Sequence, residues 1–548
     1  MKKTLIITAA AAIGLAASAQ NLSTEVVVER TIRPTERAAT RPVSIVPTIT
    51  LPGVDPVTLR TAGYSNLSDI TRGFTRLRPA DGAVMPERGP WRGYVEGGYF
   101  PVAFGGLSAG YRVLDKDNMC LGVWGQFNYD SYKPQKDFDE KNNLLGVRIG
   151  ANYDWEVNAV SRLSADMAYT YGNSKTPLRT SQSYNDFRLQ ADWESAVQGL
   201  DYHIGAKVSV DNYGDITRFA FDDARPKPVT EQTFDGLKEQ LYTLDAGASL
   251  AVGESSKVGL DLAIDYLHTS SPWVSRNEEW SNSTSFFFNP YYAVSAGQVD
   301  FRAGINIDCV ADGKFSVEQV SPDVRFAWTP LSQLSIVASA TGGKKYNTYN
   351  ALRDFTPFVA GIHSYEASFI PVDATLDINI GPFNGFNVRL SGGYASAKDW
   401  LMAAGTDVES IFSVEDVKGF HGGITAAYNH RIFDVEASTH FADNGQHGYY
   451  MWRDRAKAVI AAAARVRPVK GLEAGLTLEC RLDRKVGDYI NDPDKNNVID
   501  LGLHATYNFT PAFGVFADVN NLLCRREVIA HGITSPTIHG LVGVSLKF

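Results

Sequence analysis

The chain has 548 residues and a formal net charge of −9, and it is rich in glycine and aromatic residues, with 48 Gly, 25 Tyr, 28 Phe and 9 Trp. An acidic chain argues against nucleic-acid binding, which requires a basic face. The four cysteines, Cys120, Cys309, Cys480 and Cys524, lie far apart and have no metal-ligand spacing. They predict neither a metal site nor a disulfide framework, although one disulfide among them stays open.

Residues 1–19 have the pattern of a secretory signal peptide. A positive start at Lys2 and Lys3 is followed by an apolar stretch over 5–16 and by a small-residue triplet at 17–19, after which cleavage is expected. An uncleaved anchor is the alternative, but the apolar stretch is short for a transmembrane helix. Beyond it no run of 18 apolar residues occurs, so the rest of the chain predicts no membrane-spanning helix.

Residues 20–90 are rich in proline, arginine and threonine and have little core-forming pattern. A short β-branched strand is expected at 24–29. Arginines at 30, 33, 37 and 41 alternate with prolines, which predicts an extended and largely unstructured segment, periplasmic or inside a lumen. Its positive charges suit an acidic wall elsewhere in the chain or a partner protein.

Residues 91–548 alternate between apolar and polar side chains. Over 472–482 the even positions are apolar, as at Leu476, and most odd positions are polar, as at Thr477. The same period recurs over 258–266, 299–307, 334–340, 499–507 and 538–548. Because successive side chains of a strand point to opposite sides, each strand has one apolar and one polar face. Lengths of about 9 to 13 residues match a tilted strand that crosses a bilayer, whereas strands of soluble sandwiches run to about 5–6 residues.

Short and long links are expected to alternate between these strands, as in outer-membrane barrels. The short links are predicted at 154–157, 253–255, 329–332, 382–384 and 510–511, and the long ones at 131–142, 212–238, 269–282, 343–366, 398–417 and 484–497. Two assignments are ambiguous: a strand at 286–296 that turns at 297–298, and a glycine-rich hairpin of 94–99 with 104–113. If the strand and the hairpin are both counted, the sequence predicts an all-β fold. It is a transmembrane antiparallel up-and-down barrel of about 22 strands with both termini in the periplasm.

The polar faces of these strands are predicted to line the lumen. The charged candidates are Asp261, Asp265, Asp300, Arg302, Asp308, Glu473, Glu479, Arg481 and Asp483. They could form a permeation path, or they could simply solvate a water-filled interior or pair with a segment that occludes it.

The C-terminal part of the barrel resembles the closing strands of TonB-dependent receptors. The resemblance lies in Pro511–Leu523, in the basic pair Arg525-Arg526 and in Gly543–Phe548. It implies a barrel of about 22 strands in the outer membrane, surrounded by lipid. The terminal Phe548 is similar to the signal that the barrel-assembly machinery reads. Those receptors carry a much longer plug domain before the barrel, and residues 20–90 are too short to form a complete one.

The strand expected near the mature N-terminus, Glu25, Val26, Val27, Val28 and Glu29, is similar to a TonB box. Such a box adds as a strand to the periplasmic energy-coupling protein TonB. The alternative is an edge strand that pairs within residues 20–90 or with another periplasmic or envelope protein.

Motifs for catalysis and for metal binding are weak. Gly106–Gly110 matches G-x-S-x-G, but it lies within a predicted strand and no helix follows, as a nucleophile elbow would require. Asp492, Asp494 and Asn496 supply oxygen atoms that could bind calcium in a loop, although such a run is usually a solvated turn. We therefore expect no catalytic residue, no other metal site and no cofactor.

Three functions are compatible with this pattern. The first is a non-enzymatic outer-membrane barrel without a full plug, acting as a pore or as a subunit of an envelope transport or assembly complex. The second is a TonB-energised uptake receptor with a reduced N-terminal gate, and the third, the least supported, is a membrane-embedded hydrolase. Because a lumen of this size is normally plugged, we expect residues 20–90, the long links or a partner to occlude it.

Overall fold

In the computed structural model, the residues described are 91–548, apart from 102–103, 134–140, 176–179, 222–227, 235, 271–281, 313, 351–366, 404–411, 444–455, 485–496 and 531–532. The predicted signal peptide and the 20–90 segment with its TonB-box-like strand lie outside the described residues. Within the described part of the chain, no helix is long and apolar enough to cross a membrane.

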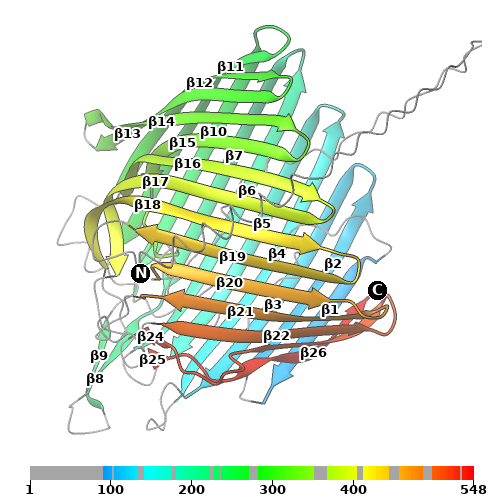
Figure 1. The fold of residues 1–548 in the computed structure, drawn as a ribbon. Helices are drawn as coiled ribbons and strands as arrows, with labels where there is room; N and C mark the ends of the chain where they lie inside the picture. The colour runs from blue at the N-terminus through cyan, green and yellow to red at the C-terminus, as the bar shows by residue number, and fades with distance from the viewer. Residues whose placement is uncertain are drawn as a thin grey trace, which may run out of the picture. The chain divides into compact units, whose positions relative to one another are not determined.

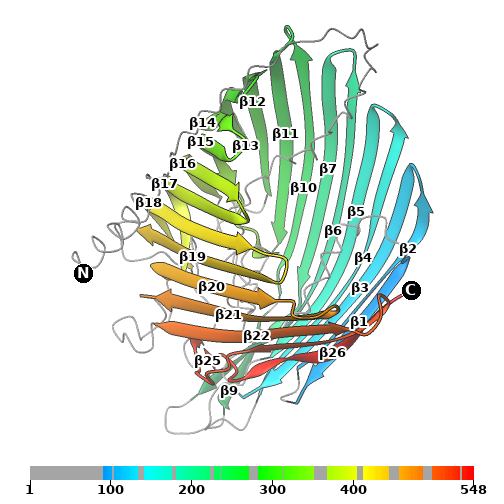
Figure 2. The ribbon, with the colours of Figure 1, turned by 45° about the vertical axis from the view of Figure 1, so that its right-hand side comes forward.

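The described strands form one closed antiparallel wall of 22 strands, as predicted (Figures 1 and 2). The wall consists of β1 (Gly93–Phe100), β2 (Phe104–Lys116), β3 (Met119–Tyr132), β4 (Asn142–Asn158), β5 (Ser161–Lys175), β6 (Thr180–Val197), β7 (Leu200–Tyr213), β10 (Lys238–Ala251), β11 (Ser256–Ser270), β12 (Asn282–Ala296), β13 (Val299–Asp312), β14 (Lys314–Leu331), β15 (Leu334–Lys345), β16 (Ser368–Phe383), β17 (Phe386–Ala403), β18 (Phe412–Asn429), β19 (Phe433–Asp443), β20 (Ala458–Val466), β21 (Leu472–Leu482), β22 (Val498–Asn508), β23 (Phe513–Asn520) and β26 (His539–Lys547). Each strand pairs with the next one in this order, and β1 closes the wall against β26.

Two hairpins stand outside this wall. The first consists of β8 (Ile216–Phe221) and β9 (Pro228–Phe234), and β8 pairs briefly with β6. The second consists of the short strands β24 (Val528–Ala530) and β25 (Ile533–Thr534). Both ambiguous assignments are confirmed, since β12 and the first hairpin, β1 with β2, belong to the wall.

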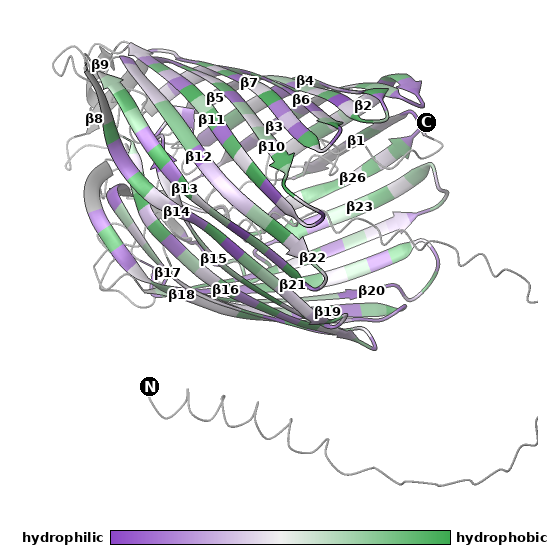
Figure 3. Ribbon diagram, turned by 90° about the horizontal axis from the view of Figure 1, so that it is seen from above, coloured by the Kyte–Doolittle hydropathy of each residue, from purple (hydrophilic) through white to green (hydrophobic). Residues whose placement is uncertain are grey.

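Apolar and polar residues alternate along the strands, as Figure 3 shows in its hydropathy colours. The apolar residues are the exposed ones: Leu476 is 50% exposed and Val544 is also 50% exposed. In a soluble protein these side chains would be buried, but on the outer surface of a transmembrane barrel they face lipid. The opposite, polar face of each strand points into the barrel.

Three predicted short links are wrong in position. Residues 154–157 lie within β4, residues 329–331 within β14, and residues 382–383 within β16, so the turns come later. The first error has a clear cause. Asp154 forms an ion pair with Arg162 of β5 at 2.6 Å, so its polarity belongs to the inner face of a strand and not to a turn. The links at 253–255 and 510–511 are confirmed, because β10 ends at Ala251 and β23 begins at Phe513.

The predicted long links are partly strand. The link at 212–238 contains the β8–β9 hairpin, and the links at 343–366 and 398–417 are shortened because β15, β17 and β18 extend into them. Several strands, such as β14 and β18, have 18 residues. A bilayer needs only about 9–11 residues of tilted strand, so these strands continue beyond the membrane and the polar pattern there resembles a loop.

The C-terminal residue completes the sheet at the seam between β1 and β26. The carbonyl oxygen of Phe548 accepts hydrogen bonds from the backbone N–H groups of Arg92 and Gly93, both at 2.8 Å. The Phe548 ring stacks near Tyr111, with ring centroids 6.3 Å apart. A Cβ atom on Gly93 would lie 2.7 Å from the Phe548 ring, so a larger residue there would displace the terminal ring.

Candidate functional site

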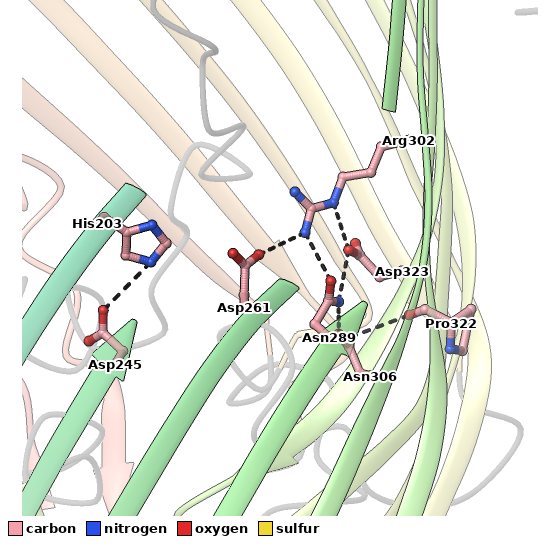
Figure 4. Close-up of polar contacts among 8 residues, drawn as sticks. All are labelled: His203, Asp245, Asp261, Asn289, Arg302, Asn306, Pro322 and Asp323. Atoms are coloured by element: carbon pink, nitrogen blue, oxygen red, sulfur yellow. Dashed lines mark hydrogen bonds and ion pairs between the residues drawn. The ribbon is translucent and has the colours of Figure 1, made fainter. Parts of the chain in front are cut away.

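A cluster of charged side chains lies on the inner face of β11 to β14, with Arg302 at its centre (Figure 4). One terminal nitrogen of Arg302, Nη2, lies 3.0 Å from Asp261 Oδ2, and its Nε lies 2.8 Å from Asp323 Oδ2. The Arg302 guanidinium also sits 3.6 Å from the ring centroid of Tyr291. Two carboxylates and one aromatic face thus hold a single cation in place.

Two asparagines complete this cluster. The side chain of Asn289 accepts a hydrogen bond from Arg302 at 3.1 Å and donates one to Asp323 at 3.0 Å. Asn289 also donates to Asn306, whose own amide nitrogen donates to the carbonyl oxygen of Gly342 at 2.9 Å. The polar groups therefore satisfy one another across the five neighbouring strands β11 to β15, which holds the inner surface rigid.

Glycine makes room for the aromatic part of the cluster. A Cβ atom on Gly259 would lie 2.2 Å from the Tyr291 ring, so the ring lies flat over the β11 backbone. Gly259 pairs directly with Tyr291 in the register of β11 with β12. A larger residue at Gly259 would push the ring away from Arg302.

A second cluster lies beside the first on β7 and β10 (Figure 4). The Asp245 carboxylate is 3.6 Å from Lys207 Nζ and 3.9 Å from His203 Nε2. Lys257 on β11 forms an ion pair with Asp201 on β7. In both clusters, therefore, acidic side chains lie next to basic ones on the inner face of the wall.

The far part of the wall carries a third cluster, at β21. Glu473 pairs with Arg465 at 3.3 Å and with Arg467 at 3.0 Å. At the other end of the same strand, Glu479 lies 3.1 Å from Arg481. Arg481 is almost fully buried, and it also contacts Glu527 of the segment between β23 and β26.

Two of the remaining predicted residues, Asp265 and Asp308, lie near each other and near Lys344. Asp265 accepts a hydrogen bond from Thr243 at 2.5 Å, and Asp308 is buried beside the end of β15. Asp300 shares the inner face of β13 with Arg302 and is exposed. Asp483 differs from its prediction as a strand residue: it lies past the end of β21, with a φ of 54° and an exposed side chain. Side chains alternate between the two faces of the wall only as far as the strand is paired, and the last paired residue of β21 with β22 is Arg481. The alternation therefore does not predict where the side chain of Asp483 lies.

Sequence reasoning missed several residues of these clusters. Asp323 follows Pro322, which interrupts the strand pattern in β14, and Glu527 lies between two strands in a segment for which the sequence predicts no element. Asn289 and Asn306 are uncharged, so a search for inward charges passed them over. The alternation of inward and outward side chains along a strand could have identified Asp323 and both asparagines. No pattern in the neighbouring sequence marks Glu527.

The candidate motifs for other chemistry do not assemble. Ser108 of the G-x-S-x-G match lies inside β2, nearly buried, with its hydroxyl 3.2 Å from the Tyr94 hydroxyl, and so lacks the turn of a nucleophile elbow. All four cysteines are free. Among the described residues no group of His, Cys, Asp and Glu side chains could hold a metal ion. The calcium candidates Asp492, Asp494 and Asn496 lie outside the described residues.

The closed wall, its apolar outer face and its charged lumen have the architecture of a transmembrane β-barrel. Within the chain, residues 97–197 match the model of a protein family of unknown function, DUF481. None of the curated proteins compared with the chain matches it.

Solved structures of TonB-dependent receptors have the same barrel. The siderophore receptor PirA from Acinetobacter baumannii aligns with a TM-score of 0.58 and 9% identity, covering 84% of this chain and 80% of that receptor. A mutant of the ferric enterobactin receptor PfeA from Pseudomonas aeruginosa aligns with a TM-score of 0.59 and 12% identity, covering 83% and 80%. The FrpB iron transporter from Neisseria meningitidis aligns with a TM-score of 0.58 and 13% identity, covering 88% and 83%. At such identities the likeness concerns the fold.

Proposed function

We propose that this protein is a non-enzymatic outer-membrane pore for small polar solutes, and that residues 20–90 occupy part of its lumen. The observation that carries the proposal is the inner surface: charged side chains from β7 to β14 pair with one another and leave a polar wall in a closed barrel. Such a surface stabilises water and dissolved ions inside a pore.

Charge supports the placement of the N-terminal segment. Residues 91–548 contain 41 basic and 54 acidic residues, whereas residues 20–90 contain nine arginines and seven acidic residues. An arginine-rich segment of opposite net sign is attracted to an acidic barrel. A barrel of this strand number leaks when it is empty, so an occluding segment on the same chain would serve the cell.

Ion selectivity in planar bilayers tests the pore. The full-length protein should conduct ions, and Arg302→Gln should shift its reversal potential in a salt gradient toward cation selectivity. The reason is that the change removes the cation between Asp261 and Asp323. The matched control is Arg431→Gln, which removes the same charge from a residue in the turn between β18 and β19. Absence of conductance in the full-length protein, together with no conductance after the 20–90 segment is removed, would refute the pore.

The alternative is active uptake energised by TonB. It is favoured by the fold shared with receptors whose names state siderophore binding and iron transport, and by the TonB-box-like strand Glu25–Glu29. Val27→Pro should then abolish strand addition to TonB, because proline cannot donate the ladder hydrogen bond. The test is cross-linking of TonB to the unmodified chain and to Val27→Pro, with Ala39→Pro, outside the strand predicted at 24–29, as the control. Equal cross-linking in all three, or none in any, would reject this alternative.

The proposed non-enzymatic barrel has a second possible role, as a subunit of an envelope transport or assembly complex. In that case residues 20–90 recruit a periplasmic partner, and native purification from membranes should recover that partner with the barrel.

Assembly itself is proposed to depend on Phe548, which the barrel-assembly machinery would read. Deleting Phe548 should lower the amount of folded barrel in the outer membrane, whereas Phe548→Tyr should preserve it.

A further inference from the structure

The segment that follows β15, Tyr346–Asn350, folds against the inner side of the wall. Tyr349 is 1% exposed and Asn350 is 6% exposed, although neither belongs to a strand. A link at the rim of a barrel is normally solvated. Burial of this kind shows that the segment is packed on other parts of the barrel, and we call it the strap.

One end of the strap is held by β7 and β10. The backbone N–H of Tyr349 donates a hydrogen bond to Glu239 Oε1 at 3.0 Å. The Tyr349 ring packs edge-on against Tyr213, with ring centroids 5.5 Å apart. Glu239 and Tyr213 lie on the polar, inward faces of their strands, in line with Asp245 and His203. The contact is therefore made on the lumen side of the wall.

The other end of the strap is held near its own strand. The Tyr346 hydroxyl forms a hydrogen bond with Ser285 Oγ of β12, and Asn347 Nδ2 donates to Ser368 Oγ of β16 at 2.9 Å. In the wall, β15 and β7 are separated by β10 to β14. The anchors are nevertheless all at one rim of the wall, because Tyr213 ends β7, Glu239 is at the start of β10, Ser285 is near the start of β12 and Ser368 begins β16. The strap therefore runs along the inner side of this rim.

The anchor at Glu239 is a buried carboxyl group. Glu239 is 3% exposed, and its register partner on β7, Asp211, is equally buried. A carboxylate in such a place is stabilised by a hydrogen bond from a backbone N–H group. Loss of the Tyr349 contact would leave Glu239 beside Asp211 with one hydrogen bond fewer, which favours the strap in its closed position.

From this geometry we propose that the strap is a fixed constriction at the mouth of the lumen and that Glu239 is the residue that holds it closed. The inference rests on the proposed pore function, because it states which segment limits passage on the β7–β15 side. The contacts described above hold the strap against the inner side of the wall. Solutes that pass would be those that fit beside the strap, and release of the strap would admit larger ones.

The first test measures conductance of the full-length protein in planar bilayers. Glu239→Ala removes the acceptor for the Tyr349 N–H, and we expect the single-channel conductance to rise on the order of twofold, because conductance follows the narrowest part of a pore. Glu239→Gln keeps an oxygen acceptor and should give a smaller rise than Glu239→Ala. The control is Glu254→Ala, which removes an exposed glutamate in the turn between β10 and β11.

A second variant at the same anchor provides the matched comparison. Tyr213→Ala removes the ring that packs against Tyr349 and leaves Glu239 in place. It should raise the conductance as Glu239→Ala does, and the double variant should add little, because both changes release the same end of the strap. Heat-modifiable gel mobility equal to that of the unmodified protein excludes a general folding defect as the cause of the larger conductance.

A second readout separates the failure of this inference from the failure of the pore. Thr348→Cys in the cysteine-free protein should react faster with a water-soluble maleimide when Glu239 is alanine than when it is glutamate. Equal labelling rates would overturn the role of Glu239. Faster labelling with unchanged conductance in a conducting protein would overturn the constriction. If no variant conducts, the pore function fails, and the labelling rates alone then decide whether Glu239 holds the strap.

Discussion

Glu527 accepts two hydrogen bonds from the Arg481 guanidinium, at 2.8 and 2.9 Å, although the two residues are 46 positions apart. The same carboxylate lies 2.8 Å from Arg484. Both arginine side chains are only 3% exposed. The segment between β23 and β26 is thus fastened to the end of β21 by one acidic residue.

Glu527→Ala should lower the stability of the barrel by about 3–5 kcal/mol, because it leaves buried arginines without their main counter-charge. Chemical unfolding from lipid vesicles measures this change. The control is Asp154→Ala, which breaks the exposed pair with Arg162 and should cost less than about 1 kcal/mol. Equal losses in the two variants would contradict the assignment of Glu527 as a buried anchor.

The two faces of β21 should respond differently to arginine. Leu476→Arg places a charge in lipid and should cost roughly 2–4 kcal/mol if Leu476 lies near the bilayer midplane, whereas Thr477→Arg on the lumen side should cost much less. The two residues are neighbours and both are exposed, so they differ mainly in the side of the wall that they face. The free energy of unfolding from vesicles is the measurement. Equal costs would mean that the face assignment is wrong.

The long links at 212–238, 343–366 and 398–417 should face outside, and the turns at 253–255 and 510–511 should face the periplasm. In a cysteine-free chain, Asp215→Cys should react with a membrane-impermeant maleimide in intact cells, and Glu254→Cys should react only after the outer membrane is opened. Both residues are exposed, so accessibility on the protein does not limit the reaction. Labelling of Glu254→Cys in intact cells would reverse the orientation.

Deleting residues 20–86 should leave a folded, heat-modifiable barrel, because the described wall begins at β1. Gel mobility of heated and unheated samples tests assembly. If the segment occludes the lumen, the truncated protein should conduct far better than the full-length one. If it recruits a partner, conductance should barely change while the partner is lost from purified membranes. Failure to assemble would show that these residues contribute to the wall and would remove the proposed division at residue 90.

The sequence alone determined the barrel. Alternation over stretches such as 472–482 requires a strand with one apolar and one polar face, and the length of those stretches suits a membrane. The number of wall strands followed from counting them. These features depend on neighbouring residues along the chain, which explains why they could be predicted without knowing which strands pair.

Only the tertiary structure decided which residues meet across the lumen. Arg302 reaches Asp261 and Asp323 because the registers of β11 to β14 bring their inner faces together. Tyr349 meets Glu239 across 110 positions, and Glu527 meets Arg481 from the segment between β23 and β26. Such contacts depend on strand register and on the curvature of the closed wall. Neither property is encoded in a local pattern, because a shift of register changes every cross-strand partner while the alternation along each strand stays the same.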